Sequence, residues 1–239
     1  MPRKNRQFKV GGVYHIINRG VEKRNIFLKS QDYSRFILGL EFFNRRNTYN
    51  NLWELIAEAG TVPASAGERL NKEREKNTKP IIEILAFALM PNHYHLILRE
   101  IQDGGTSLFM RKMGGYSTYF NKQNERVGPL FQGRYKAVTI ENDNQLTTIF
   151  NYVHTNPIGL IESGWKDLKV KNKKKAIDYL YAYKWSSFHD YIGQPKYPHL
   201  LQKNFYLDIF GSEKECQQVV EDWINFKAEN AKLDKKILE

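Results

Sequence analysis

The strongest pattern in the sequence is a pair of apolar runs joined by a short turn. Residues 81–89 are apolar at every position but one, and residues 93–99 form a second run that starts with His-Tyr-His. The Met-Pro-Asn step at 90–92 lies between them, and proline and asparagine favour tight turns. Two such runs predict neighbouring antiparallel strands, and the first run is apolar enough for a central position in a sheet.

Further elements can be placed on either side of this hairpin. Residues 13–17 and 134–140 are typical of strands, and residues 31–46 and 107–123 show helical spacing. The resulting order is the split β-α-β-β-α-β pattern of ferredoxin-like and RRM-like folds. We therefore predict an α+β fold with an antiparallel sheet and helices on one face, followed by a helix that ends at Asn156, before Pro157.

Two composition changes suggest the domain organisation. Residues 1–160 are predicted to form the core, with an insertion at 48–79 that is rich in small and charged residues. Residues 161–239 are predicted to form a basic, aromatic-rich and mainly helical C-terminal extension. Its last helix, from about residue 213, should place four side chains on one apolar face: Val219, Val220, Trp223 and Phe226.

The excess of basic residues indicates which class of molecule the protein binds. A net charge of +11 favours a polyanion, and the interleaved aromatic residues favour nucleic acid, although the charge could also serve solubility alone. The single cysteine, Cys216, excludes an internal disulfide. No apolar run approaches the roughly 18 residues of a membrane span. We expect a soluble cytoplasmic protein associated with the nucleoid.

The start of the second apolar run carries a candidate metal site. Side chains alternate along a strand, so His93 and His95 should point to the same face. Two imidazoles close together suit a divalent cation. The alternative is a pair of surface histidines hydrogen-bonded to water or carboxylates.

A second pair of candidate residues lies one helical turn apart near the end of the 143–156 helix. Asn156 offers a carboxamide oxygen, a donor suited to Mg²⁺ or Mn²⁺, and Tyr152 offers a phenol that becomes a nucleophile once deprotonated. Asn156 could instead cap the helix end. Tyr116 and Tyr119 are rival nucleophiles, but neither has an oxygen donor one turn later.

Several motifs together resemble the single-tyrosine HUH transposases, and most closely the REP-associated tyrosine transposases. The resemblance spans about residues 8–195 and depends on the segments 90–98, 128–136 and 151–157 and on Trp185-Ser186-Ser187. It implies an RRM-type ferredoxin core, His93, His95 and Asn156 as metal ligands, and Tyr152 as the catalytic nucleophile.

The same resemblance implies an activity. Such a protein is a metal-dependent single-stranded DNA endonuclease and strand transferase that uses Mg²⁺ or Mn²⁺. It forms a 5′-phosphotyrosine intermediate and rejoins strands during transposition, a form of DNA recombination, at hairpin or palindromic repeat DNA. The resemblance favours a monomer over a homodimer. Five basic residues are candidate contacts to phosphates: Arg19, Arg111, Lys112, Arg134 and Lys136.

Three other functions fit parts of the pattern. One is an HUH nickase of the replication-initiator or relaxase type. The second is a non-catalytic nucleic-acid-binding module with vestigial histidines. The third is a phosphodiesterase that uses water as its nucleophile.

Overall fold

The computed structural model describes residues 7–45, 79–165, 170 and 172–229. The predicted insertion at 48–79 lies outside these residues except for Lys79. None of the helices in the described part of the chain combines the length and apolar character that crossing a membrane requires.

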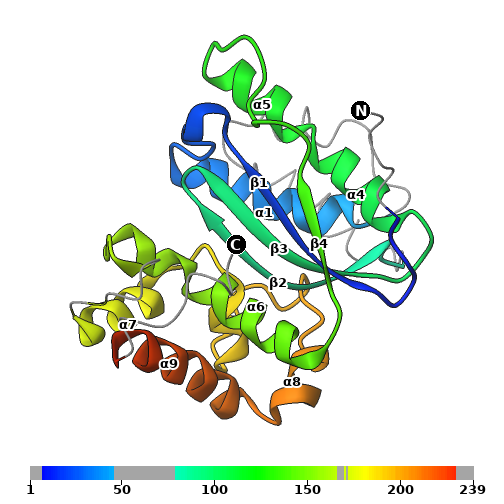
Figure 1. Ribbon diagram of the computed structural model, residues 1–239. Helices are drawn as coiled ribbons and strands as arrows, with labels where there is room; N and C mark the ends of the chain where they lie inside the picture. Colours follow the sequence, from blue (N-terminus) through cyan, green and yellow to red (C-terminus); the bar gives the residue numbers. More distant parts are fainter. Residues whose placement is uncertain (1–6, 46–78, 166–169, 171, 230–239) are drawn as a thin grey trace.

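A four-stranded antiparallel sheet forms the centre of the molecule (Figure 1). Its strands lie in the order β2-β3-β1-β4, as in the predicted ferredoxin-like core. The bounds are β1 (Val13–Arg19), β2 (Ile82–Met90), β3 (His93–Glu100) and β4 (Lys136–Ile140). The split β-α-β-β-α-β prediction is therefore confirmed.

The predicted central position of the 81–89 run is wrong, because β2 lies at one end of the strand order. A later segment covers the outer edge of β2: the Leu89 N–H donates to the Trp185 carbonyl over 2.9 Å, and Ala88 bridges to Ser186. Helices also cover both faces of the strand. The apolar sequence of β2 therefore reflects burial on all sides rather than a central place among the strands.

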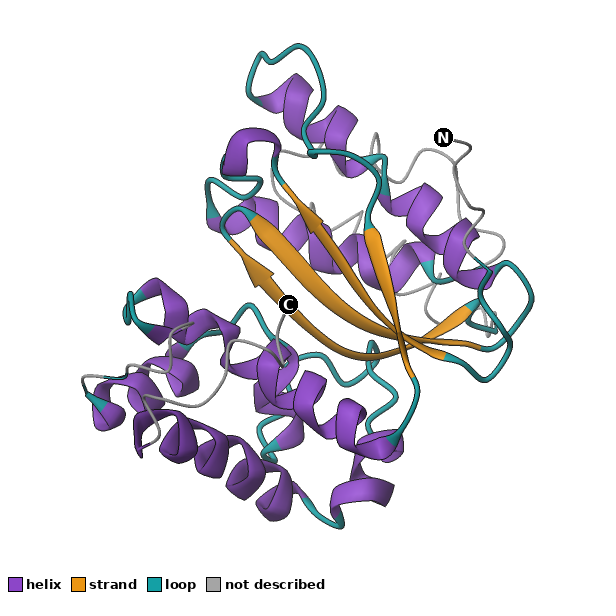
Figure 2. Ribbon diagram, in the orientation of Figure 1, coloured by secondary structure: helices purple, strands orange, loops and turns teal. Residues whose placement is uncertain are grey.

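One face of the sheet carries the helices of the predicted core (Figure 2). These are α1 (Ser30–Phe43), α4 (Gly105–Met113) and α5 (Tyr116–Gln123), with a short helix η1 (Val21–Lys23) after β1. The single helix predicted at 107–123 is divided at Gly114-Gly115. Alternate strand residues such as Tyr94 and Leu96 pack here against Phe36 and Phe109.

The sequence predicts helices on one face of the sheet only. In the structure, the C-terminal half of the chain also covers the opposite face. Here α6 (Asp143–Thr155) packs on β2 and β3. The remaining elements pack on α6 and on one another: η2 (Asn156–Leu160), α7 (Lys173–Ala182), η4 (Ser187–Tyr191), α8 (Asn204–Phe210) and α9 (Glu213–Glu229). The sheet therefore lies between two helical layers, and the predicted helical C-terminal extension forms most of the second one.

The buried face of α9 differs from the predicted one. The buried positions are Cys216, Val220, Ile224 and Lys227, spaced by three or four residues, whereas Phe226 is 43% exposed. Only Val220 is both predicted and fully buried. The prediction failed because a cysteine and a lysine occupy two of the positions that face the core.

Candidate active site

The two histidines of β3 lie together on the face that α6 covers. The rings of His93 and His95 are 4.9 Å apart between centroids, and His95 is only 2% exposed. In the register between β1 and β3, Arg19 is paired with His93 and Ile17 is paired with His95. Since directly paired strand residues point to the same side, Arg19 shares the face of the histidines.

The helix α6 brings Tyr152 to the same place. The Tyr152 ring lies 5.2 Å from the His95 ring, edge to face. Its side chain is hydrogen-bonded to that of Asn156, the buried residue directly after α6. The structure thus brings a phenol against one of the two imidazoles predicted to bind the metal, and a carboxamide is hydrogen-bonded to that phenol.

Two contacts explain why α6 lies at this position. Ser187 Oγ accepts the Phe87 N–H of β2 over 2.9 Å and is hydrogen-bonded to His154 Nε2 of α6 over 2.7 Å. Ser187 therefore joins the helix to the strand beside the histidines. His154 is fully buried, and its Nε2 is hydrogen-bonded to Ser187.

Phe150 fixes the other side of α6. It is fully buried, and its ring contacts the rings of His154, Tyr206 and Phe210 at 4.2, 4.4 and 4.9 Å. We expect Phe150→Ala to lower the free energy of unfolding by about 3–5 kcal/mol, because the cavity it leaves is enclosed by aromatic rings. Urea unfolding measures this change. The control Ile209→Ala, at a 39% exposed position of α8, should cost less than about 1 kcal/mol.

A family model matches the segment of the chain that carries these residues. Residues 68–156 match the family model described as "Transposase IS200 like". The matched segment contains the β2-β3 hairpin, α4, α5, β4 and α6, and it includes His93, His95, Tyr152 and Asn156. The predicted resemblance to tyrosine transposases is therefore confirmed, and the match supports a transposase function.

One solved structure is also similar to the chain, "Structure of the REP associates tyrosine transposase bound to a REP hairpin". The identity is 18% and the TM-score is 0.47, over 83% of this chain and 90% of that one. The comparison with curated proteins gave no match.

Within the segment matched by the family model, the hydrogen bonds of Asn92 determine which ring nitrogen of His93 carries a proton. The Asn92 side-chain amide donates to the Lys23 carbonyl over 3.1 Å, so its oxygen is the atom that lies 2.6 Å from His93 Nδ1. A carboxamide oxygen only accepts hydrogen bonds, and His93 Nδ1 therefore carries a proton. In the neutral ring, Nε2 is then the lone-pair nitrogen, which is the nitrogen that can bind a cation.

The histidine of β1 was missed as a site residue by the sequence analysis. His15 Nε2 lies 2.9 Å from His95 Nδ1, and the two rings are stacked with centroids 5.1 Å apart. Burial lowers the pKa of His15 to about 4. Its partner is 80 residues away, so no local motif signals the contact.

The pKa of the Tyr152 phenol is shifted in opposite directions by its surroundings. Burial raises its pKa, while the hydrogen bond with Asn156 and the positive charge of Arg19 lower it. The charge of Arg19 therefore favours the ionised form of the Tyr152 phenol, an effect separate from the predicted contact of Arg19 with phosphate.

The donor set fits a divalent cation, although one donor is an amide. Within the described residues, no three side chains from His, Cys, Asp and Glu form a metal-binding group. The predicted set contains two imidazoles and the carboxamide of Asn156, so it is not a cluster of that kind. Imidazole nitrogen and amide oxygen are both ordinary ligands of Mn²⁺ and related ions.

The rival tyrosines lie on the other face of the sheet. The Tyr116 hydroxyl donates to the Ile26 carbonyl over 2.6 Å, and the Tyr119 hydroxyl donates to Asp32 Oδ1 over 3.1 Å. Both belong to the cluster that contains α1 and α5, whereas the His95 ring faces α6. Tyr152 is thus the tyrosine that the fold places beside the histidines.

The five basic residues predicted to contact DNA are divided between two faces. Arg19 and Lys136 share the face of the histidines. Arg19 is paired with His93, and Lys136 of β4 is paired with Ile17 of β1, which is itself paired with His95. Arg111 and Arg134 line a hollow of about 1170 Å³ on the other face. The Lys112 ammonium donates to the Arg45 carbonyl and so is engaged within the protein.

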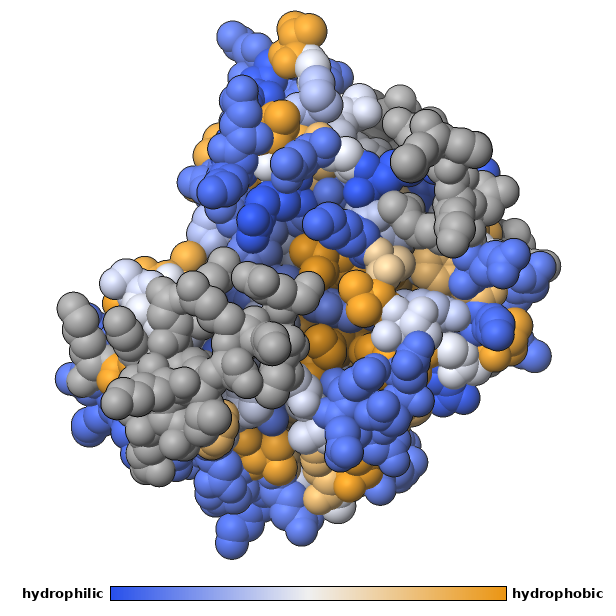
Figure 3. Space-filling view, viewed as in Figure 1, coloured by the Kyte–Doolittle hydropathy of each residue, from blue (hydrophilic) through white to orange (hydrophobic). Residues whose placement is uncertain are grey.

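The outer part of the histidine face is open to solvent. Figure 3 shows apolar surface gathered over β4, with hydrophilic surface around it. Val138 of β4 is 52% exposed and is paired with His15 of β1. Lys136, two residues earlier on the same strand, is also exposed. An accessible strip of apolar and basic side chains therefore adjoins the buried His15–His95 pair.

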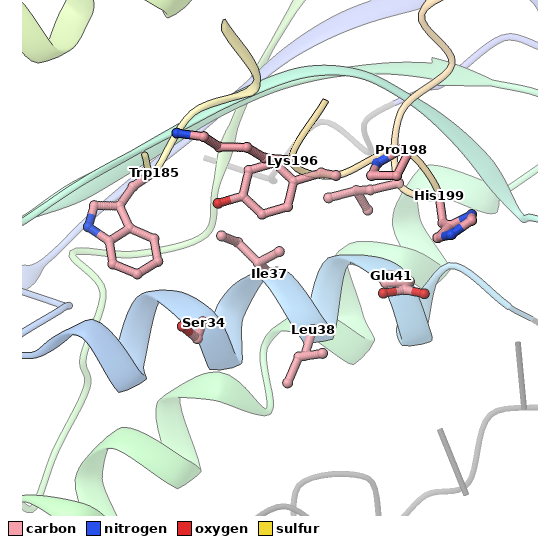
Figure 4. Close-up of a pocket in the computed structure, with 10 residues that line it drawn as sticks. Ser34, Ile37, Leu38, Glu41, Trp185, Lys196, Pro198 and His199 are labelled. Carbon is pink, nitrogen blue, oxygen red and sulfur yellow. The ribbon is translucent and has the colours of Figure 1, made fainter. Parts of the chain in front are cut away.

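A second cavity, of about 310 Å³, is separate from this site. It lies between α1 and the segment 196–200, with Trp185 at one end and Glu41 and His199 at the other (Figure 4). None of the predicted site residues lines it.

Proposed function

We propose that the protein is a metal-dependent single-stranded DNA endonuclease and strand transferase of the tyrosine transposase type, with Tyr152 as its nucleophile. The observation that carries this proposal is the position of the Tyr152 ring, 5.2 Å from His95 and hydrogen-bonded to Asn156. The match of residues 68–156 to the IS200-like transposase family supports the same reaction class.

The reaction is an in-line displacement at a phosphodiester. The phenolate oxygen of Tyr152 attacks the scissile phosphorus, and the bond from phosphorus to the 3′ oxygen breaks. The 3′ oxygen leaves as a hydroxyl after it takes up one proton from solvent, which balances the proton that the Tyr152 phenol loses to solvent on ionisation, and the 5′-phosphate stays linked to Tyr152. Attack of a 3′-hydroxyl on this phosphotyrosine releases the tyrosine and joins two strands, so the bond energy is retained without a nucleotide cofactor.

His93, His95 and Asn156 would hold the divalent cation, Mg²⁺ or Mn²⁺. When bound, the cation polarises the phosphate and offsets the charge that develops on it. The chain's own contribution is to position the groups. Asn156 is hydrogen-bonded to Tyr152, and the Arg19 charge favours the ionised phenol.

Single-stranded DNA would reach the site along the open strip of β4. Arg19 and Lys136 would contact phosphates there, and Val138 offers an apolar surface to the bases. We propose that the monomer is active, because Tyr152 lies beside His95 within one chain. We propose hairpin or palindromic repeats in chromosomal DNA as the substrate, which requires a location with access to the nucleoid.

The proposal is tested by incubating the protein with Mn²⁺ and labelled single-stranded DNA oligonucleotides, one set with a palindromic hairpin and one set without it. A labelled adduct that survives denaturation supports tyrosine chemistry. Cleavage without an adduct would favour a water nucleophile, and binding without cleavage would favour a non-catalytic module.

The hollow on the opposite face provides a prediction about DNA binding. The double variant Arg111→Gln/Arg134→Gln removes two exposed guanidinium groups from the lining of the hollow. We expect it to weaken DNA binding roughly 10–100-fold at physiological salt and to lower the slope of log K against log salt by about 1.5–2. Fluorescence anisotropy over a salt series measures both quantities.

A matched control removes the same charge elsewhere. Lys174→Gln/Lys214→Gln changes two exposed residues of α7 and α9. An equal loss of affinity in both double variants would show that only the net charge matters, and would contradict a DNA contact at the hollow.

A further inference from the structure

The contact between His15 and His95 has two alternative proton arrangements. A neutral imidazole has one N–H and one lone-pair nitrogen. Across the 2.9 Å contact, either His95 Nδ1–H donates to His15 Nε2, or His15 Nε2–H donates to His95 Nδ1. In the first arrangement the lone pair of His95 is on Nε2. In the second arrangement Nε2 carries the proton and cannot bind a cation.

Strand pairing on both sides and burial hold the His15 ring in place. His15 lies on β1 between positions paired with β3 on one side and β4 on the other, and it is 3% exposed. Its register partner on β3 is Ile97, so its ring reaches the neighbouring His95 diagonally. The ring of Tyr152 closes the other side, 6.0 Å from His15. The buried His15 ring is thus held against Nδ1 of His95.

The neighbouring histidine shows the arrangement that a cation needs. His93 carries its proton on Nδ1 because the Asn92 oxygen accepts from it. Histidines that bind metals commonly donate their other N–H to an acceptor, which fixes the tautomer and the ring orientation. A second imidazole in the same site contributes to cation binding only when it also presents a lone-pair nitrogen to the cation.

We propose that His15 is a positioning residue that accepts the Nδ1–H of His95 and thereby holds the His95 Nε2 lone pair for a divalent cation. Its part in DNA cleavage rests on the proposed function. The tautomer of His95 is a property of the metal-free protein and can be measured without any activity.

The test is a long-range ¹H–¹⁵N correlation spectrum of the metal-free, full-length protein near neutral pH. The chain has six histidines, and His95 is assigned by the signals lost in His95→Gln. We expect a protonated Nδ1 and a lone-pair Nε2 for His95 in the wild type. A wild-type His95 protonated on Nε2 would overturn the proposal, whatever the variants show.

Three variants separate positioning from packing. His15→Phe keeps a ring but removes the acceptor, so we expect His95 to change to the Nε2–H tautomer and the affinity for Mn²⁺ to fall roughly 10–100-fold. His15→Gln offers an amide oxygen at a similar reach and should restore the Nδ1–H tautomer and most of the affinity. Ile17→Val, a change at the position paired with His95 but without a polar atom, should leave both readouts unchanged.

The outcomes distinguish this inference from the proposed function. If His15→Phe leaves the His95 tautomer and the Mn²⁺ affinity unchanged, His15 is only a packing residue and the inference is wrong. If His15→Phe does not fold, the wild-type spectrum and His15→Gln still decide the tautomer. A wild type with the expected tautomer that binds Mn²⁺ but forms no DNA adduct would contradict the proposed function and leave the inference intact.

Discussion

Tyr152→Phe is expected to abolish the covalent protein–DNA adduct, with a loss of at least roughly 10⁴-fold in the rate of strand cleavage. The variant removes only the hydroxyl oxygen that would attack phosphorus. The ring that packs against His95 is retained, and the lost hydrogen bond to Asn156 is worth about 1 kcal/mol. The fold and the affinity for DNA should therefore be close to those of the wild type. Adduct formation on a denaturing gel and anisotropy measure the two effects.

The matched control is Tyr119→Phe, which removes a phenolic hydroxyl from the other face of the sheet. That hydroxyl donates to Asp32, and its loss should leave the adduct unchanged. If Tyr152→Phe still cleaves DNA at the wild-type rate, the nucleophile is water or another residue, and the assignment of Tyr152 is wrong.

His95→Gln is expected to give the second large effect. It removes an imidazole nitrogen proposed to bind the cation while it keeps a polar side chain at a position that is 2% exposed. We expect the affinity for Mn²⁺ to fall roughly 100-fold or more and cleavage at low Mn²⁺ to be lost with it. Titration of Mn²⁺ by electron paramagnetic resonance measures binding directly, and a chelator should stop cleavage by the wild type.

His199→Gln is the control for this variant, because His199 is exposed and lines the cavity beside α1 instead of the candidate active site. It should bind Mn²⁺ as the wild type does. Equal Mn²⁺ affinity in wild type and His95→Gln would show that the β3 histidines do not hold the cation.

The fold of the core could be predicted because its signals are local. The apolar runs of β2 and β3, the turn between them and the helical spacing of α1 are each visible within a few residues. The pairing of Tyr152 with Asn156 is local too, since a separation of four residues places both on one side of a helix. For this reason the residues that resemble the transposases could be found before their arrangement in space.

Long-range contacts could not be predicted in this way. The contact of His15 with His95 depends on the register between β1 and β3, and a shift by one residue would turn His15 to the other face. The position of β2 at the sheet edge depends on coverage by Trp185 and Ser186, about 100 residues later. The bond of Ser187 to His154 likewise joins two helical segments that have no sequence motif in common.

The packing of the helical layer on the histidine face also depends on long-range contacts that local sequence patterns do not predict. The sequence predicts a C-terminal helical extension, but not that its aromatic residues would enclose Phe150. Because this layer shares a core with β2 and β3, the part after residue 160 contributes to the position of α6 and hence of Tyr152. The predicted division at residue 160 stays a prediction.

Mass spectrometry of the trypsin-digested adduct tests the role of Tyr152 most directly. Cleavage after Lys136 and Lys166 gives the peptide 137–166, in which Tyr152 is the only tyrosine. After reaction with single-stranded DNA and Mn²⁺, we expect this peptide to carry a nucleotide on Tyr152 through its 5′-phosphate. A nucleotide found on another peptide, or complete cleavage of the DNA with the peptide 137–166 unmodified throughout, would contradict the assignment.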